Sequence, residues 1–334
     1  MSKQQGPLDL AELRGSVAVV TGAGNNGIGW GIAVHAAREL GMQVAIIDLH
    51  AHLAAAAAER LQALCPDVQI LGLGCDVTDP GALAQTRDTI VHTFAGRIGA
   101  LFANAGVIFN HTIMKSTPQE WQTTLNVNIL GVVNTLQAFT PQMQAHREAS
   151  VICTTASVGG LVRGDGGGAS YQASKHAVVA LTESFSFELA RRHPQIRVHV
   201  LCPCIVRSGL MVTSQTNAKA HSGDLDPEEI NPFQPGEEMI YAMTPERHAQ
   251  QVFDLIAKGD FYMITDNVRP YVDHDHPFDG LGIVRERLDN LLDLQLDNAD
   301  AFESGPHGSP TSILKGPMFE QVKAARQADQ GDAS

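Results

Sequence analysis

Short apolar runs alternate with helical patterns along most of this 334-residue chain. The runs are continuously apolar, which is typical of strands buried on both faces of a parallel sheet. They lie at residues 17–20, 44–47, 70–73, 100–103, 151–153, 196–201 and 261–264. Because helical segments separate consecutive runs, the sequence predicts an α/β fold: a doubly wound, seven-stranded parallel sheet with helices on both faces.

The alternation fails in two places. Residues 205–240 are rich in Ser, Asn, Pro and acidic residues, and we expect them to form an irregular substrate-binding lid. Residues 273–334 form a C-terminal extension, in which residues 283–292 fit an amphipathic helix; the part beyond Gly305 is polar, and we expect an extended arm or partial disorder there. We therefore expect one α/β domain at residues 1–272, followed by a tail that is helical and then extended.

Charge and cysteine content exclude several classes of partner. The net charge of −13 argues against nucleic acid or an anionic membrane surface, since both require a basic face. The five cysteines form an odd set without framework spacing, so we expect reduced thiols in a cytoplasmic protein. We expect no signal peptide, because the first residues contain no apolar stretch, and no run reaches the length of a membrane helix.

A Gly-rich turn from Thr21 to Gly29 joins the first predicted strand to a helix. Glycines at such a turn let the backbone approach a pyrophosphate, which the helix N-terminus stabilises. Asp48 ends the second strand, where a carboxylate accepts a hydrogen bond from a ribose 2′-OH and repels a 2′-phosphate. No Lys or Arg lies in the turn or directly after Asp48. These features predict NAD rather than NADP; the alternative is a glycine turn without chemical use.

Tyr171 and Lys175 lie at positions i and i+4 of a predicted helix and therefore share one face of it. A cation beside a phenol favours the phenolate, which makes a tyrosine a usable acid or base near neutral pH. Ser157 follows the preceding strand and could hydrogen-bond the oxygen that gains or loses the proton. The alternative is a surface lysine beside a packed tyrosine.

Over residues 13–270 the chain resembles the short-chain dehydrogenases/reductases, whose fold is Rossmann-like. The matching motifs are the turn Thr21–Gly29, Asp76-Val77, Asn104-Ala105-Gly106, Val127-Asn128-Ile129-Leu130-Gly131, Ser157 and Tyr171-x-x-x-Lys175. The resemblance implies a catalytic tetrad of Asn128, Ser157, Tyr171 and Lys175. In that tetrad Tyr171 would be the acid or base, Ser157 would hold the substrate oxygen, Lys175 would lower the pKa of Tyr171, and Asn128 would hold a relay water. Asn126 is a neighbouring alternative to Asn128.

The resemblance also implies sites for NAD and for a small-molecule substrate. Its cofactor contacts fall on Gly22, Asn25, Asn26, Gly27, Ile28, Gly29, Asp48, Leu49, Asp76, Val77, Asn104, Ala105, Gly106, Tyr171, Lys175, Pro203, Cys204, Ile205 and Ser208. The expected substrate contacts are Ile108, His111, Ser157, Val158, Tyr171, Leu210 and Met211, with Phe109 beside them. For His111 a surface position is an equal alternative. The pocket would be mostly apolar.

Two departures from the family pattern stand out. Four residues, Ala23 to Asn26, separate Gly22 from Gly27, one more than the usual spacing, so either asparagine of the turn could make the polar contact. Pro203-Cys204 and then Ser208 replace the usual Pro-Gly and Thr, and Cys204 is either a tolerated small residue or a thiol near the nicotinamide. Neither Cys202-x-Cys204 nor Asp273–His276 makes a convincing metal site, so we expect none.

The sequence therefore predicts an NAD(H)-dependent oxidoreductase that interconverts a secondary alcohol and a ketone. The tail is weakly similar to bacterial family members that oxidise the benzylic alcohol of lignin-type aryl ethers, which suggests a bulky or aromatic substrate. The helix 171–192 matches one that pairs subunits in the family, so we expect a homodimer or homotetramer. Alternatives are a C=N or C=C reductase, an epimerase, or a non-catalytic NAD-sensing protein.

Overall fold

The computed structural model describes residues 6–94, 96–161, 167–210 and 242–265. All of them belong to one compact unit, Gln5–Phe278. Most of the predicted lid and all of the predicted C-terminal extension lie outside the described residues.

The described residues contain one sheet of seven strands, and all strand pairs are parallel. The strands are β1 (Val17–Thr21), β2 (Gln43–Asp48), β3 (Ile70–Gly74), β4 (Ile98–Ala103), β5 (Ser150–Thr155), β6 (Ile196–Pro203) and β7 (Tyr262–Thr265). Their order is β3-β2-β1-β4-β5-β6-β7, so the doubly wound sheet predicted from the apolar runs is confirmed.

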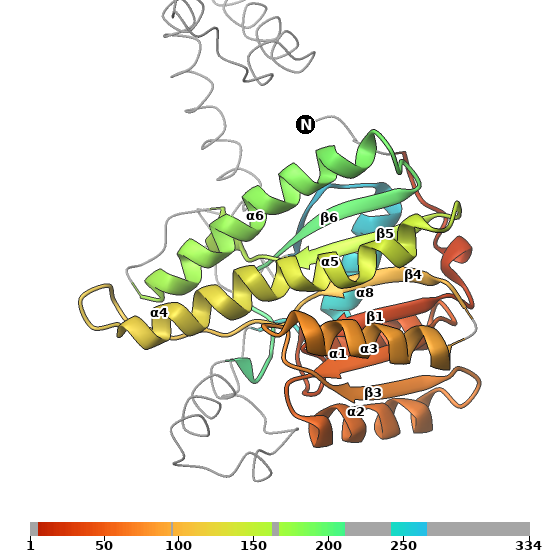
Figure 1. Cartoon of the computed structure of the whole chain (residues 1–334), viewed down its shortest axis with the longest axis horizontal. Helices are drawn as coiled ribbons and strands as arrows, with labels where there is room; N and C mark the ends of the chain where they lie inside the picture. The colour runs from red at the N-terminus through yellow and green to blue at the C-terminus, as the bar shows by residue number, and fades with distance from the viewer. Residues whose placement is uncertain (1–5, 95, 162–166, 211–241, 266–334) are drawn as a thin grey trace, which may run out of the picture. The chain divides into compact units, whose positions relative to one another are not determined.

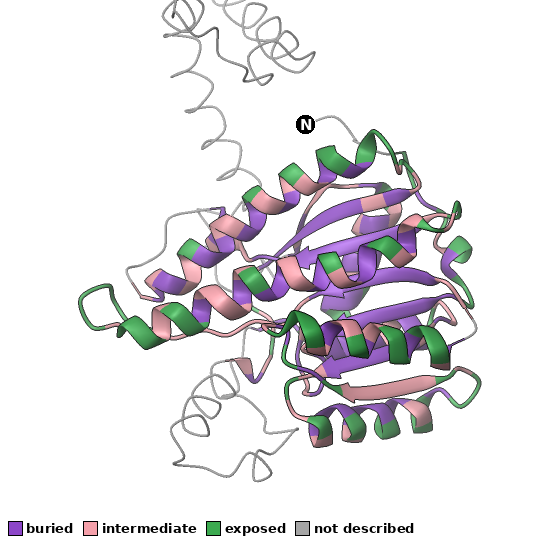
Figure 2. Ribbon diagram, viewed as in Figure 1, coloured by how far each residue is buried: buried purple, intermediate pink, exposed green. Residues whose placement is uncertain are grey.

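Helices cover both faces of this sheet (Figure 1). They are α1 (Ile28–Arg38), α2 (Ala51–Leu64), α3 (Pro80–Thr93), α4 (Pro118–Leu125), α5 (Gly131–Gln144), α6 (Ala169–Ala190) and α8 (Pro245–Lys258), with the short turns η1 (Leu10–Leu13), η2 (Asn126–Leu130) and η3 (Val158–Gly160). α3, α5 and α6 lie on the face toward the viewer in Figure 1, and α1 and α8 lie on the opposite face. Figure 2 shows the buried strands between helices whose outward faces are exposed.

Helix starts follow the local sequence. Asp79 caps α3 by accepting hydrogen bonds from the N–H groups of Gly81 and Ala82, and Pro80 occupies the first helical position. Thr244 and Pro245 begin α8 in the same way. A short polar side chain satisfies backbone donors that have no partner inside the helix, and proline has no N–H to satisfy.

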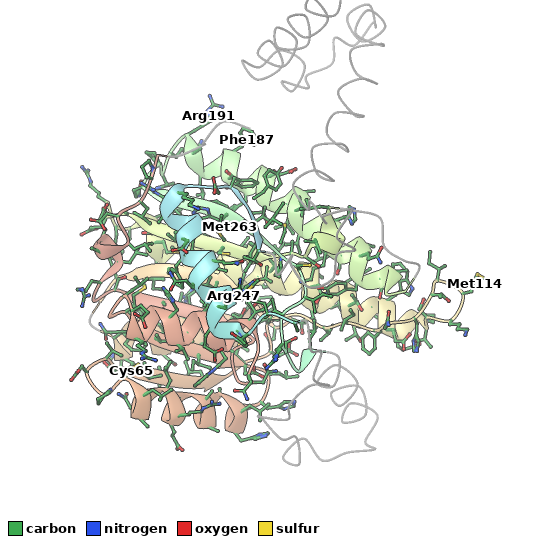
Figure 3. All side chains as sticks on the ribbon, turned by 180° about the vertical axis from the view of Figure 1, so that it is seen from behind. Cys65, Met114, Phe187, Arg191, Arg247 and Met263 are labelled. Atoms are coloured by element: carbon green, nitrogen blue, oxygen red, sulfur yellow. The ribbon has the colours of Figure 1, made fainter. Side chains whose placement is uncertain are left out.

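α8 packs against α1 on the face of the sheet that is turned toward the viewer in Figure 3. Gly31 of α1 lies directly against the backbone of Pro245, so a Cβ at this position would collide with the carbonyl group. His35 stacks on Phe253 with ring centroids 4.5 Å apart. Phe253 of α8 and Met263 of β7 belong to the same hydrophobic core cluster, so α8 packs on the strand at this edge of the sheet.

The strand order reverses beside β1, because β1 lies between β2 and β4. In a doubly wound sheet the crevice at this reversal, beyond the carboxyl ends of the strands, is the ligand site. Thr21 and Asp48 end β1 and β2 at this edge, and Thr155 ends β5. Among the described residues, no helix is long and apolar enough to cross a membrane.

His248 of α8 gives the fold a specific acid sensitivity. Its side chain is fully buried, and neither ring nitrogen has a hydrogen-bond partner. Burial lowers the pKa of His248 to about 4, from 6.5. Because the folded pKa lies below the unfolded one, stability is fully present above about pH 6.5 and is lost as the pH falls toward 4. The linked loss is on the order of 3 kcal/mol.

We therefore expect the thermal midpoint of His248→Leu to depend less on pH between 7 and 4.5 than that of the wild type. His92→Gln, at an exposed position of α3, is the matched control and should follow the wild type. Equal slopes for wild type and His248→Leu would show that this histidine is not the acid-sensitive group.

Candidate active site

A cavity of about 510 Å³ lies beyond the carboxyl ends of the central strands. Its lining combines the Gly-rich turn, the end of β2, the segment after β4, the end of β5, the start of α6 and the segment after β6. The lining residues are Gly22, Asn25, Gly27, Ile28, Ile47, Asp48, Leu49, Cys75, Asp76, Val77, Asn104, Ala105, Gly106, Val107, Ile108, Val127, Thr155, Ala156, Ser157, Tyr171, Lys175, Pro203, Cys204, Ile205, Val206, Arg207, Ser208 and Leu210. Most of the residues predicted to bind a cofactor therefore surround one cavity.

The Gly-rich turn is held against the strands around it. Gly22 has a φ of 65°, which favours glycine, and a Cβ there would lie 2.7 Å from the Cα of Ala105. The N–H of Gly24 donates to Oδ2 of Asp48 at 2.8 Å. Burial raises the pKa of Asp48, and the bond from Gly24 opposes this shift. Asp48 therefore fixes the turn while it also lines the cavity.

Two predicted cofactor contacts, Asn26 and Gly29, do not line the cavity. Gly29 is the close-packing glycine of the turn, because a Cβ there would lie 2.6 Å from the carbonyl oxygen of Gly22. Asn26 accepts a hydrogen bond from Nη1 of Arg60 at 2.7 Å. Asn25 lines the cavity, so the structure distinguishes the two asparagines that the sequence left open.

Thr21 and Asn104 tie the ends of three strands together. The hydroxyl of Thr21, at the end of β1, accepts the N–H groups of Asn104 and Ala105 at 3.0 and 3.1 Å. The Asn104 amide donates to the carbonyl groups of Thr21 and Gly22 and accepts from the hydroxyl of Thr155. Asn104 is thus a structural bridge as well as a cavity residue.

Asn128 lies in η2, a π-helical turn between α4 and α5. Its side chain is fully buried and bonds both backbone groups of Val107: Oδ1 accepts the N–H at 2.8 Å, and Nδ2 donates to the carbonyl at 3.0 Å. Nδ2 also donates to the hydroxyl of Ser174 at 2.9 Å. Asn128 therefore fixes the segment after β4 against α6. π-turns inside α-helices are frequent at functional sites.

Lys175 points into the same region from α6. It is only 3% exposed, and its Nζ donates to the carbonyl oxygen of Thr155 at 2.8 Å. A Cβ on Gly106 would lie 3.4 Å from Nζ and 3.2 Å from Oδ1 of Asn128, so both groups border Gly106. Burial lowers the pKa of Lys175 to about 8, so its ammonium group titrates close to neutral pH.

Tyr171 and Ser157 complete the cluster. Ser157 follows β5 and accepts the N–H of Gly159 at 3.1 Å, which holds its hydroxyl at the start of η3. Burial raises the pKa of Tyr171, and a hydrogen bond with Ser157 opposes this shift. The Nζ of Lys175 lies 5.4 Å from the centroid of the Tyr171 ring. Burial is the largest cause of the shift, so its direction differs from the lowering expected from the sequence.

The expected substrate contacts separate into two groups. Ile108 and Leu210 line the cavity, together with the apolar side chains of Ile205 and Val206. Val158 and Phe109 do not line it, and Met211 lies outside the described residues.

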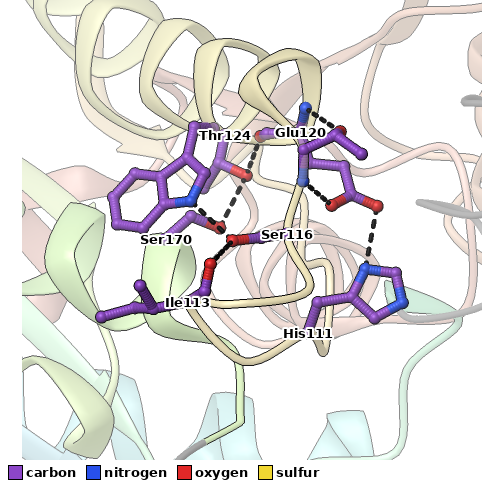
Figure 4. Close-up of polar contacts among 8 residues, drawn as sticks. His111, Ile113, Ser116, Glu120, Thr124 and Ser170 are labelled. Atoms are coloured by element: carbon purple, nitrogen blue, oxygen red, sulfur yellow. Dashed lines mark hydrogen bonds and ion pairs between the residues drawn. The ribbon is translucent and has the colours of Figure 1, made fainter.

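His111 lies away from the cavity, in a polar network at the start of α4 (Figure 4). Its Nδ1 is 2.9 Å from Oε1 of Glu120, and its side chain is 51% exposed. Glu120 and Thr117 form a capping box, and the hydroxyl of Thr124 lies 3.3 Å from that of Ser170. The network holds the loop before α4 against the residue preceding Tyr171, so His111 occupies the surface alternative.

Sequence reasoning missed Thr155, whose carbonyl oxygen holds Lys175, and Thr21, whose hydroxyl holds the segment after β4. It also missed Arg207, which lines the cavity beside Ser208. The signal for each was position alone, at the last residue of a strand or just beyond one. Within the described residues no group of three or more His, Cys, Asp or Glu side chains could hold a metal ion. None of the five cysteines forms a disulfide.

The doubly wound sheet, the Gly-rich turn at its reversal point and the Ser-Tyr-Lys cluster define a dinucleotide-binding α/β protein. A family model described as short chain dehydrogenase matches residues 16–219. The chain belongs to the short-chain dehydrogenase/reductase family.

Individual relatives agree with this assignment. The 3-oxoacyl-[acyl-carrier-protein] reductase FabG of Staphylococcus epidermidis is 33% identical over 202 residues, which are 60% of this chain and 77% of that protein. A short-chain dehydrogenase/reductase from Burkholderia phymatum, solved in complex with NAD, is 29% identical with a TM-score of 0.67 and covers 85% of this chain and 96% of that one. LigO from Sphingobium sp. strain SYK-6 covers 96% of this chain and 97% of that one at 24% identity and a TM-score of 0.64, which shows the shared fold alone.

Proposed function

We propose that this protein is an NAD(H)-dependent oxidoreductase that interconverts a secondary alcohol and a ketone. The observation that carries the proposal is the convergence of Ser157, Tyr171 and Lys175 on the cavity that also contains Asp48 and the Gly-rich turn. A proton-transfer group and a nucleotide site in one cavity are what a carbinol dehydrogenase requires. The proposal draws support from family membership and from the NAD bound to the Burkholderia phymatum relative.

In the oxidation direction, Tyr171 accepts the hydroxyl proton of the substrate. The cofactor supplies the hydride acceptor, so an alcohol and NAD⁺ give a ketone, NADH and one proton. Ser157 donates a hydrogen bond to the substrate oxygen, and Lys175 stabilises the Tyr171 phenolate that precedes proton transfer. Asn128 fixes Val107 and Ser174 beside them. In the proposed relay, a water at Asn128 would link Lys175 to solvent. In the reduction direction Tyr171 returns the proton.

The nucleotide end of the cavity should hold the adenosine ribose at Asp48 and the pyrophosphate at the start of α1. The helix has no side-chain cap at Gly27, so its first N–H groups are available to a phosphate. Leu49, Asp76 and Val77 border the adenine end, and the segment Pro203–Ser208 borders the nicotinamide end. Arg207 adds a cation to this lining. Among the described lining residues, Lys175 is the other Lys or Arg.

We expect kcat/KM with NAD to exceed that with NADP by roughly 10²-fold, because Asp48 repels a 2′-phosphate. Asp48→Asn is the matched variant, since its side-chain oxygen can still accept the N–H of Gly24 while the charge is removed. Asp48→Asn should reduce the ratio of kcat/KM with NAD to kcat/KM with NADP, while the Gly-rich turn keeps its conformation. The measurement is steady-state kinetics of the wild type and of Asp48→Asn with NAD and with NADP. A wild-type preference for NADP would contradict the role given to Asp48.

The substrate end is mostly apolar, with Ile108, Ile205, Val206 and Leu210 in its lining. This composition favours a bulky apolar or aromatic alcohol. A panel of secondary alcohols and ketones graded by size and aromaticity, followed by NADH absorbance, tests this choice. Turnover of imines, of conjugated C=C bonds or of epimerisable sugars instead would support a different reaction on the same fold, and NADH binding without turnover of any substrate would support a sensor.

We also expect a homodimer or homotetramer in a reducing, cytoplasmic setting. Phe187 on the outer face of α6 is 66% exposed in the single chain, and an exposed aromatic side chain is what a subunit contact would cover. Light scattering that gave a monomer would count against the oligomer.

A further inference from the structure

The cofactor turn of this chain is one residue longer than the family spacing, and the structure shows how the additional residue is accommodated. Asn25 faces the cavity, whereas Asn26 accepts a hydrogen bond from Arg60 on α2. The next residue, Gly27, donates its N–H to the carbonyl oxygen of Asn25 at 2.9 Å. The turn therefore reverses direction at Asn26, with a contact to another helix at that point.

Arg60 is itself held in place. Its Cζ lies 4.6 Å from the centroid of the Trp30 ring, within the range of a cation–π contact. Trp30 is only 3% exposed and belongs to α1, the helix that the turn begins. A guanidinium group is planar, so it can stack on the indole ring and still direct Nη1 toward Asn26. The Asn26 oxygen lies 2.7 Å from that nitrogen, which is the distance of a charge-assisted bond.

The turn is consequently fixed from two sides. Asp48 of β2 holds Gly24 at the start of the additional length, and Arg60 of α2 holds Asn26 at its end. Between these two points only Asn25 remains to face the cavity. If Asn26 were released, the turn would have one unconstrained residue at the entrance to the pyrophosphate site.

We propose that Arg60, through Asn26 and Trp30, is a positioning residue that holds the lengthened turn in its cofactor-binding conformation. The inference rests on the proposed function, because it assigns the turn to the NAD pyrophosphate. Arg60 lies outside the cavity lining, so it acts on the position of the turn and contacts neither cofactor nor substrate.

A double-mutant cycle tests this role. Arg60→Ala and Asn26→Ala should each raise the Kd for NADH and for ADP by roughly five- to tenfold, and Arg60→Ala should leave kcat at saturating cofactor unchanged. The double variant should bind NADH and ADP no more weakly than the weaker-binding single variant, because both substitutions remove the same hydrogen bond. Arg38→Ala, an exposed arginine of α1 that pairs with Glu39, is the matched control and should leave both Kd values unchanged.

Trp30 provides a second readout. The chain has two tryptophans, so the Trp121→Phe background reports emission from Trp30 alone. In that background Arg60→Ala should shift the emission spectrum, because the guanidinium group no longer lies over the indole ring, and ADP should not restore it. Asn26→Ala retains Arg60, so its emission shift should be smaller, and ADP should partly reverse it by re-forming the turn.

The outcomes separate the two proposals. If the wild type binds neither NADH nor ADP, the proposed function fails. If the wild type binds both and the variants at Arg60 and Asn26 bind equally well, the positioning role alone is overturned. An Arg60→Ala effect that disappears at high salt, together with an unaffected Asn26→Ala, would also overturn it, because a long-range charge effect would then explain the loss.

Discussion

Replacing Tyr171 with phenylalanine should lower turnover by about 10²- to 10⁴-fold while NADH still binds with nearly wild-type affinity. The hydroxyl is the group in the Ser157–Tyr171–Lys175 cluster that can exchange a proton with a substrate oxygen in the cavity. The ring itself packs at the start of α6, and phenylalanine preserves that packing. Steady-state kinetics and a titration of NADH fluorescence, measured on the same preparation, separate the two effects.

Tyr262→Phe is the matched control for this substitution. Tyr262 is a partly buried tyrosine on β7 that hydrogen-bonds Glu183, and it does not line the cavity. Its turnover per folded enzyme should remain within a few-fold of the wild type. If Tyr171→Phe kept wild-type turnover, or if the two variants lost activity equally, Tyr171 would not be the acid or base.

Lys175→Met should produce the second large effect, a loss of about 10²-fold or more in kcat/KM together with an altered pH profile. Burial lowers the pKa of Lys175 to about 8, so the ammonium form predominates below that pH and is lost as the pH rises through it. Burial also raises the pKa of Tyr171. Lys175→Met removes the ammonium charge, so the Tyr171 phenolate loses this stabilisation below about pH 8, where the wild-type lysine is charged.

The measurement is kcat/KM for alcohol oxidation between pH 6 and 10. The loss in Lys175→Met relative to the wild type should be largest below about pH 8 and smaller above it, where the wild-type lysine has itself lost its charge. Lys115→Met, an exposed lysine in the loop before α4, should retain the wild-type profile. A loss in Lys175→Met that was the same at every pH would mean that the lysine charge does not act on the tyrosine.

The sheet could be predicted from the sequence because local patterns determined it. Continuous apolar runs gave all seven strands, and Asp79, Thr244 and Pro245 marked helix starts. Errors were confined to boundaries: α6 begins at Ala169, two residues before the expected Tyr171. A helix boundary depends on which residue last finds a hydrogen-bond partner, and at Gly168 the backbone adopts a left-handed conformation that no periodicity reveals.

The cavity lining was also largely predictable, because family motifs fall at strand ends that a doubly wound sheet brings together. Contacts between distant side chains were not. The bond from Arg60 to Asn26 joins residues 34 apart, and the bonds of Asn128 to Val107 and Ser174 join residues 21 and 46 apart. Such pairs depend on how elements that are distant in the sequence pack against each other. The raised pKa of Tyr171 likewise depends on burial, which spacing alone does not measure.

The π-helical turn at Asn126–Leu130 makes the site sensitive to chain length as well as to residue type. A π-turn accommodates one residue more than an α-helical turn between the same flanking helices. Deleting one residue from this segment would restore a regular α-helical turn between the same flanking helices and change the direction of side chains within the turn by about 100°. Asn128 would then leave Val107 and Ser174, although α4 and α5 would remain intact. Gene variants with single-codon deletions here should therefore yield folded protein with a dismantled active site, while most substitutions on the outer face of α5 should be tolerated.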